Sequence, residues 1–395
     1  MAIAAAARPL CDVVFLCDRD RPHVAEHLDS IREHAAVVDI TGLGVEQVCA
    51  VVADLAPAGV LTFSEYQLAL TAEVAAATGL PFHDAAVVRT LVDKLAQREA
   101  LAAAGVQSTR CVVVTTPEEA VTAVAEVGLP AVVKPRHGAG SQDTCRVADA
   151  AEAATVVARF LAGPAGRREF VVEELLVGDP AAAGEFWGDY VSVESVVQHG
   201  EIQTVCVTGK FRLAEPFRET GMLLPATLAP ELAARVVDLE RRALRALGVR
   251  YGVTHTELKL TADGPRVIEV NGRLGGYVGE ILQRAGRFDL AGAAVRVALG
   301  LPVRVPPIRW RQLAYQYFLT PPTDRTTLVS LTGVEDVAAL PGVRAVDIRA
   351  TPGQRVDWRA GTQGHLGIVY GTAPDHDSLR TVVQEIESRL RPTYA

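Results

Sequence analysis

Two carboxylates, an amide and a guanidinium occur within one short stretch of the chain, at Glu257, Glu269, Asn271 and Arg273. They lie on two strand-like segments, residues 254–260 and 267–271, and the Asp-Gly pair in the loop between them predicts a β-hairpin. In a hairpin centred on Asp263, Glu257 lies opposite Glu269 with Cβ atoms about 5 Å apart, where like charges repel. A divalent cation such as Mg²⁺ offsets this repulsion, because it binds carboxylate oxygens together with substrate phosphates.

The same alternation adds two more side chains to that strand face, Asn271 directly and Arg273 if the strand extends. The pattern therefore predicts a site for Mg²⁺ and phosphate, with Glu257, Glu269 and Asn271 as metal ligands. A solvated hairpin with scattered charges is the alternative. The apolar residues around Glu269 argue against it, because they indicate a substantially buried strand.

Lys134 and the glycine loop that follows it form a second candidate site, with Gly138, Gly140 and Ser141 in the loop. Backbone N–H groups of such a loop can approach phosphate oxygens closely. The loop is not a Walker A motif, because no Gly-Lys-Ser/Thr follows, and it leads into a strand rather than the helix of a dinucleotide-binding motif. A tight hairpin turn explains the loop equally well.

Two adjacent acids, Glu173 and Glu174, lie inside an apolar strand-like run that ends at Leu176. Strand alternation points their side chains to opposite faces, so at least one of them can reach a cleft. An edge strand with one solvated acid is an equally good interpretation.

The elements that position these residues follow three different rhythms. Residues 1–108 alternate strands (13–17, 35–40 and 59–63) with helices (45–55, 65–78 and 84–104), which predicts a small parallel sheet covered by helices. Residues 109–177 predict a small α+β lid, with Thr116 as the N-cap of its first helix. Residues 178–395 predict a strand-rich catalytic domain with a flexible connection at 179–190 and an extra subdomain from about residue 310.

Composition excludes several classes of protein. Charged residues make up only 22% of the chain and apolar runs recur throughout, which excludes a disordered chain. The net charge is −8 and no basic stripe is present, so we expect no nucleic-acid partner. No apolar run approaches the ~20 residues of a membrane span, and we expect no signal peptide. The six cysteines and nine histidines lack metal-binding spacing, which is typical of a reduced, cytoplasmic protein.

Lysine is rare, because only four of the 39 basic residues are lysines: Lys94, Lys134, Lys210 and Lys259. In a chain that otherwise uses arginine, a retained lysine marks a place where a compact ammonium group is preferred to a planar guanidinium.

Together these motifs resemble the ATP-grasp superfamily of carboxylate–amine ligases over nearly the whole chain. The matching motifs are Asp93-Lys94 with Arg98 and Gly105, Val132-Val133-Lys134-Pro135 with the glycine loop, Val172-Glu173-Glu174, Ser192-Val193-Glu194, and Glu257 with Glu269-Val270-Asn271-Gly272-Arg273. Residues 254–259, Arg218-Glu219-Thr220-Gly221 with Pro225, Leu340-Pro341-Gly342-Val343 and Pro352-Gly353 are most similar to the dipeptide-forming L-amino acid ligases. The resemblance implies an α/β (α+β) ATP-grasp fold with an N-terminal βαβ domain, a small lid and a large antiparallel sheet.

The resemblance also implies roles for the matching positions. ATP would contact Lys94, Lys134, Lys210, Gly138, Gly140 and Ser141, with Glu173, Glu174 and Leu176 at the adenine edge. Mg²⁺, or Mn²⁺ as an alternative, would bind Glu257, Glu269 and Asn271, and Arg273 would bind an acyl phosphate. The family's ribose-binding acid has three competing candidates, Asp179, Glu185 and Asp189.

The expected reaction joins a small-molecule carboxylate to an amine through an acyl phosphate, releasing ADP and phosphate in specialised metabolism. Glu194, Glu219 or His255 could accept the proton of the attacking amine. Gly276 and Tyr277 could wall the substrate pocket, although an ordinary packing tyrosine is equally consistent with the sequence.

Other ATP-grasp chemistry, such as that of a carboxylase subunit or a purine-synthesis ligase, stays open. A nicotinamide-dependent oxidoreductase and a non-catalytic nucleotide-binding protein are less well supported. A homodimer is left open.

Overall fold

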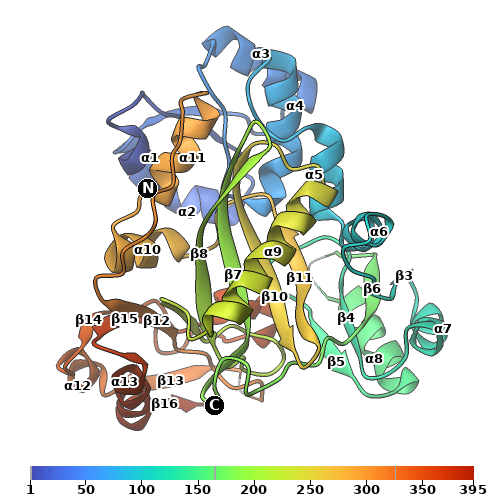
Figure 1. Cartoon of the computed structure of the whole chain (residues 1–395), viewed down its shortest axis with the longest axis vertical. Helices are drawn as coiled ribbons and strands as arrows, with labels where there is room; N and C mark the ends of the chain where they lie inside the picture. The colour runs from blue at the N-terminus through green and yellow to red at the C-terminus, as the bar shows by residue number, and fades with distance from the viewer. Residues whose placement is uncertain (1, 164–165, 325) are drawn as a thin grey trace.

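The computed structural model describes residues 2–163, 166–324 and 326–395, and one large antiparallel sheet runs through the middle of the molecule (Figure 1). Its eight strands follow the order β11-β10-β7-β8-β9-β12-β15-β14. The strands are β7 (Trp187–Gln198), β8 (Glu201–Phe211), β9 (Gly221–Leu224), β10 (Gly252–Thr261), β11 (Gly264–Asn271), β12 (Leu313–Phe318), β14 (Val343–Ile348) and β15 (Gly367–Ala373). This confirms the large antiparallel sheet expected from the sequence.

Alternating residues of the central strands face two separate hydrophobic clusters. Val193 and Val197 of β7 pack with helix α9 (Pro230–Ala246), whereas Val196 packs with helices α10 (Val278–Gly286) and α11 (Leu290–Ala298). Because successive side chains of a strand point to opposite faces, one strand serves two different environments. The candidate site lies on the α10 and α11 face, which we call the site face.

The β10–β11 hairpin has the predicted register. Glu257 pairs with Glu269 and His255 pairs with Asn271, with a β-bulge after Glu257. The strands extend further toward the turn than predicted, so only residues 262–263 lie between them. Strand β11 ends at Asn271, so Arg273 lies beyond the strand rather than on its continuation.

The N-terminal region differs from the predicted βαβαβ unit. Strands β1 and β2 pair in parallel, but residues 59–63 form no strand and run against helix α11, where Gly59 lies against the Ala298 carbonyl. Tertiary packing thus replaces the expected third ladder. The elements are α1 (Ala2–Ala7), β1 (Val14–Cys17), α2 (Pro22–Arg32), β2 (Ala36–Asp39), α3 (Val45–Leu55), η1 (Glu65–Gln67) and α4 (Leu68–Thr78).

The helix predicted at 84–104 is two helices, α5 (Ala85–Val92) and α6 (Lys94–Ala103). Asp93 is extended between them and caps α6 by accepting hydrogen bonds from the backbone N–H groups of Leu95 and Ala96. An aspartate at this position stabilises a new helix start, and helical periodicity alone does not reveal such a break.

The lid is a four-stranded antiparallel sheet in the order β3-β6-β4-β5, with helices α7 and α8 packed together. Its elements are β3 (Cys111–Val114), α7 (Pro117–Val127), β4 (Ala131–Pro135), β5 (Cys145–Val147), α8 (Ala150–Leu161) and β6 (Phe170–Glu174). Thr116 caps α7 as predicted, because its hydroxyl accepts from the backbone N–H of Glu119. The lid lies beside α6 and the free edge of the central sheet (Figure 1).

The C-terminal segment contributes strands to the central sheet and a separate two-stranded ladder. Its other elements are β13 (Leu328–Thr332), α12 (Val334–Ala338), η2 (Trp358–Gly364), α13 (His376–Arg389) and β16 (Arg391–Tyr394). Trp187, expected in a flexible connection, is the first residue of β7 and is buried against Phe211 and His376. In the part of the chain that the structure describes, no helix is both long and apolar enough to cross a bilayer.

Candidate active site

The predicted metal ligands come together at the end of the β10–β11 hairpin. Glu257 and Glu269 are directly paired, and Lys94 Nζ lies 3.0 Å from Glu269 Oε1. The Asn271 amide oxygen accepts a hydrogen bond of 3.1 Å from Arg273. Lys94, the first residue of α6, thus brings positive charge to the carboxylate pair.

Glu65 is a site residue that the sequence did not predict. Its carboxylate Oε2 lies 3.0 Å from Arg273 Nε, and the Glu65 side chain is only 7% exposed. The pKa of Glu65 is raised above its ordinary value, because burial and the nearby Glu269 together outweigh the lowering effect of Arg273. The N-terminal region therefore supplies an acid to the same charge cluster as Lys94.

A chain of charged groups runs along the site face of β7 and β10. His255 Nδ1 lies 2.9 Å from Glu194 Oε1, and His255 Nε2 lies 3.4 Å from Glu257 Oε1. Ser192 and Thr208 donate hydrogen bonds to the same fully buried Glu194 carboxylate. Burial alone would lower the pKa of His255, but Glu194 and Glu257 raise it to about 9. The imidazole is therefore protonated at neutral pH.

Lys210 projects onto the same face from β8. Its Nζ lies 2.6 Å from Glu219 Oε1 and 5.8 Å from the centre of the Tyr190 ring. Burial alone would lower the pKa of Lys210, but Glu219 and Glu257 raise it above its ordinary value. A buried ammonium that stays charged is suited to an anionic ligand.

The acid pair on strand β6 divides between two environments, as the alternation predicts. Glu173 accepts two hydrogen bonds of 3.0 Å from Arg98 and one of 3.1 Å from Lys134. Burial would raise the pKa of Glu173, but these two cations lower it to about 2. Glu174 points the other way and pairs with Arg110 and Arg266.

The glycine loop joins the lid to the rest of the site. Lys94 Nζ donates a 3.1 Å hydrogen bond to the Gly138 carbonyl, and Tyr66 donates one of 3.3 Å to the Gln142 side chain. Gly138, Gly140 and Ser141 all have positive φ. These conformations, which favour glycine, turn the loop tightly above the lysines.

Comparisons with known proteins agree with this arrangement. A family described as the ATP-grasp domain matches residues 127–280, and one described as the L-amino acid ligase C-terminal domain 2 matches residues 317–395. The chain belongs to the ATP-grasp superfamily. Its C-terminal match is to a domain of the L-amino acid ligases, and the ATP-grasp match sets the oxidoreductase alternative aside.

Among relatives of this ATP-grasp protein, the uncharacterised protein y4rH of Sinorhizobium fredii is 32% identical over 83% of this chain and 66% of its own length. Human carnosine synthase 1 is 32% identical over 63% of this chain and 31% of that protein. Alanine–anticapsin ligase of Bacillus subtilis is 28% identical over 59% of this chain and 52% of that protein. The chain thus spans about two thirds or less of the length of these relatives.

The L-amino acid ligase from Bacillus licheniformis has the same fold. Its crystal structure covers 100% of this chain, and this chain covers 95% of it, with a TM-score of 0.79 and 22% sequence identity. The agreement in fold extends through the lid and the C-terminal segment.

The side chains of this ATP-grasp site suit a nucleotide and a hard cation. Three buried lysines, Lys94, Lys134 and Lys210, converge on one region, and each contacts a carboxylate in this structure. Glu257, Glu269 and Asn271 offer oxygen donors, which Mg²⁺ prefers. Among the described residues no three His, Cys, Asp or Glu side chains form a metal cluster.

Tyr277 lies four residues after Arg273, at the start of α10, with φ of 66°. Its hydroxyl contacts Gln363, His365 and Arg349, each at 3.2 Å, and its ring packs against Phe318. The three polar contacts come from the C-terminal segment, and no local pattern in the sequence predicted them.

The three acids considered for ribose have different surroundings. Asp189 pairs with Lys259 at 2.7 Å and lies against Gly178. Asp179 accepts from the backbone N–H of Ala181, and Glu185 is exposed. Lys259, the fourth lysine of the chain, is thus paired with Asp189.

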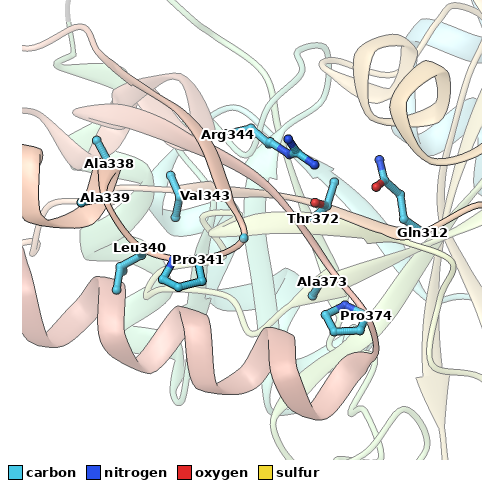
Figure 2. A pocket seen from close by; sticks show the side chains of 11 residues that line it. Gln312, Ala338, Ala339, Leu340, Pro341, Val343, Arg344, Thr372, Ala373 and Pro374 are labelled. Atoms are coloured by element: carbon cyan, nitrogen blue, oxygen red, sulfur yellow. The ribbon is translucent and has the colours of Figure 1, made fainter.

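A cavity of about 620 Å³ is formed by residues of the C-terminal segment together with Gln312 (Figure 2). It lies between the start of β14 and the end of β15, with Arg344, Thr372 and Gln312 pointing toward one another (Figure 2). None of the predicted site residues lines it.

Proposed function

We propose that this protein is an ATP-dependent ligase that joins the carboxylate of an amino acid to an amine, through an acyl phosphate, with release of ADP and phosphate. The observation that carries the proposal is the pairing of Glu257 with Glu269 beside Asn271, Arg273 and the buried lysines. Such an arrangement can neutralise the charge that develops during phosphoryl transfer.

Glu257, Glu269 and Asn271 would hold Mg²⁺, with Mn²⁺ as an alternative. The cation would supply Lewis-acid stabilisation of the phosphoryl oxygens. Lys94, Lys134 and Lys210 would then exchange their present carboxylate partners for phosphate oxygens. Each lysine keeps its charge on such an exchange, because another anion takes the place of the first.

Arg273 would bind the acyl phosphate and the tetrahedral intermediate, because its guanidinium reaches the end of the hairpin from just beyond β11. Glu65 would orient Arg273 by holding its Nε, while its terminal nitrogens donate to the Asn271 side chain and the Leu274 carbonyl and each keep a second N–H for an oxygen ligand. Gly275 makes this turn possible, because a Cβ there would collide with His255 Nδ1.

Among the three candidates for deprotonating the amine, we favour Glu219. Its side chain is 18% exposed, whereas Glu194 is fully buried and His255 is 6% exposed. A proton acceptor must reach the attacking amine, and a protonated imidazole cannot accept a proton. His255 would instead hold Glu257 in place for the cation.

Glu173, with Glu174 and Leu176, would lie at the adenine edge, and Asp189 is the best placed of the three acids for the ribose because it borders the end of the lid. Dipeptide or amide formation in specialised metabolism is the setting that we propose. The likeness to alanine–anticapsin ligase and carnosine synthase 1 supports a small-molecule acid and amine as substrates. The six free cysteines support a reducing, cytoplasmic location.

The test is phosphate release from ATP–Mg²⁺ against a panel of amino-acid pairs, with products identified by mass spectrometry. We expect at least one pair to give amine-dependent ADP and a product smaller by one water than the sum of its substrates. The matched variants are Glu269→Ala, which should abolish turnover, and Glu201→Ala, an exposed change on β8 that should preserve it. Turnover that survives Glu269→Ala would remove the metal-site interpretation.

A further inference from the structure

Residues 358–365, which we call the bridge, contact the lid, the glycine loop and the Tyr277 region together. The bridge includes η2 and the residue that follows it. It belongs to the C-terminal segment, so it is far from all of these regions in sequence. None of the motifs that predicted the site includes it.

The lid end of the bridge is Trp358. This side chain packs against the hydrophobic core of the lid, and Arg159 of α8 lies 5.3 Å from the centre of its ring. An arginine stacked on tryptophan is a favourable cation–π contact. The C-terminal segment therefore packs against the body of the lid as well as against its glycine loop.

The middle of the bridge meets the tip of the glycine loop backbone to backbone. Thr362 N–H donates a 3.0 Å hydrogen bond to the Gly140 carbonyl. Gly361 has φ of 63° and ψ of −141°, and a Cβ at this position would collide with the same carbonyl oxygen. Glycine is thus required twice, by conformation and by space.

Two further contacts tie the bridge to the chemistry. Thr362 Oγ1 accepts a 3.4 Å hydrogen bond from the backbone N–H of Glu219, the residue that pairs with Lys210. Gln363 and His365 contact the Tyr277 hydroxyl, and the His365 ring stacks on Phe318 with centres 5.2 Å apart. The bridge therefore touches both the loop above the lysines and the wall beside Arg273.

The three contacts of the Tyr277 hydroxyl use its full hydrogen-bonding capacity. A phenol donates one hydrogen bond and accepts two. If Tyr277 donates to Gln363, as the geometry gives it, then Arg349 and a neutral His365 protonated on Nε2 are the donors. Burial and Arg349 lower the pKa of His365 to about 4, which is consistent with the neutral ring. A shift of Tyr277 therefore cannot leave Gln363 and His365 undisturbed.

We propose that the bridge is a positioning segment that couples an acyl donor beside Tyr277 to closure of the glycine loop over the ATP phosphates. The proposal rests on the proposed function for the location of the acyl donor. A ligand that fixes Tyr277 fixes Gln363 and His365, and through them Gly361 and Thr362, which hold the Gly140 carbonyl. By thermodynamic reciprocity, nucleotide binding then strengthens acyl-donor binding by the same factor.

Gly361→Ala tests the docking of the loop, and Gly353→Ala is its matched control. Gly353 lies in the same segment and also has positive φ, but a Cβ there has no atom within 4 Å. We expect Gly361→Ala to speed amide hydrogen exchange in the glycine loop and to weaken AMP-PNP–Mg²⁺ binding at least fivefold, measured by calorimetry. Equal exchange and equal affinity in the two variants would overturn the proposal.

The coupling is tested by titrating AMP-PNP–Mg²⁺ with and without the amino acid that gives the fastest phosphate release in the panel. In the unmodified protein and in Gly353→Ala, that amino acid should tighten AMP-PNP binding about fivefold, a typical coupling. In Gly361→Ala the factor should fall toward one. If the amino acid tightened AMP-PNP binding by the same factor in Gly361→Ala, the bridge would have only a structural role and the proposed coupling would be wrong.

Thr362→Val provides a milder second variant, because it keeps the backbone N–H to Gly140 and removes the hydroxyl near Glu219. It should keep AMP-PNP affinity and lower the turnover rate. A panel without any amine-dependent ADP would overturn the proposed function and the coupling together. Amide hydrogen exchange and AMP-PNP affinity in Gly361→Ala and Gly353→Ala would still decide separately whether the bridge holds the glycine loop.

Discussion

Strands β7 and β10 carry buried polar residues on both faces, and the two faces differ in the partners that they offer to these residues. On the site face, Glu194 pairs with His255 and accepts from Ser192 and Thr208. On the α9 face, Ser195, Thr254 and Thr256 lie under the helix beside Glu240. The Thr254 and Thr256 hydroxyls have no hydrogen-bond partner among the described residues, and Ser195 lies close enough to Glu240 to lower its pKa.

The pKa directions follow this difference. Burial would raise the pKa of Glu194, but His255 lowers it below its ordinary value. Burial raises the pKa of Glu240 to about 7, and the charge of Glu194 on the other face adds to the rise. One face therefore keeps its buried carboxylate ionised and ready for cations, whereas the other favours the neutral acid.

Glu194→Gln should produce the largest effect, because it leaves the buried His255 with one carboxylate instead of two. Removing one partner of a buried ion pair costs about 3 kcal/mol or more, and turnover should fall at least 100-fold because Glu257 loses its orientation. Chemical denaturation and phosphate release measure the two effects. Glu201→Gln is the exposed control, and an unchanged unfolding midpoint in Glu194→Gln would contradict the site-face description.

Lys134→Arg tests the lid side of the site while keeping the positive charge at this position. A guanidinium needs more room and a planar partner, whereas the buried Lys134 ammonium donates one 3.1 Å hydrogen bond to Glu173 on the neighbouring strand. We expect about a 100-fold loss of kcat/KM for ATP, close to 2.7 kcal/mol. Lys259→Arg, where the partner Asp189 is more exposed, should lose much less, and equal losses would show that the site tolerates arginine.

Glu240→Gln tests the α9 face through pH. Since the folded pKa of Glu240 is raised to about 7, the folded state holds the proton more tightly than the unfolded chain does. Stability is therefore highest below about pH 4.5 and declines as the pH rises through 7, by up to about 3 kcal/mol for this group. Glu240→Gln should remove that decline between pH 5 and 8 in denaturation curves. A pH profile identical to that of the unmodified protein would show that the folded state already stabilises the ionised form of Glu240.

Two threonine-to-valine changes compare the faces with the least disturbance. Thr208→Val removes a hydroxyl that donates to Glu194, and it should cost about 1–2 kcal/mol of unfolding free energy. Thr256→Val removes a buried hydroxyl without a partner among the described residues, and its effect should stay within about 0.5 kcal/mol. Equal losses in the two variants would erase the distinction between the faces.

Local patterns predicted much of the site face. The Asp-Gly pair and strand alternation placed Glu257 opposite Glu269, and the adjacent acids Glu173 and Glu174 do face opposite sides. The same reasoning failed for residues 59–63, which look like a strand but pack against α11. Apolar alternation reports which face is buried, and it does not report whether a neighbouring strand is present to pair.

The sequence by itself determined the β10–β11 hairpin, the N-cap of α7 and the opposite facing of Glu173 and Glu174, because turn chemistry, capping and strand alternation act between residues close in the chain. Tertiary structure alone decided that Glu65 holds Arg273, that Arg98 shares Glu173 with Lys134, and that Gly361 meets Gly140. These partners are far apart in sequence, and they meet only after the sheets and helices have packed.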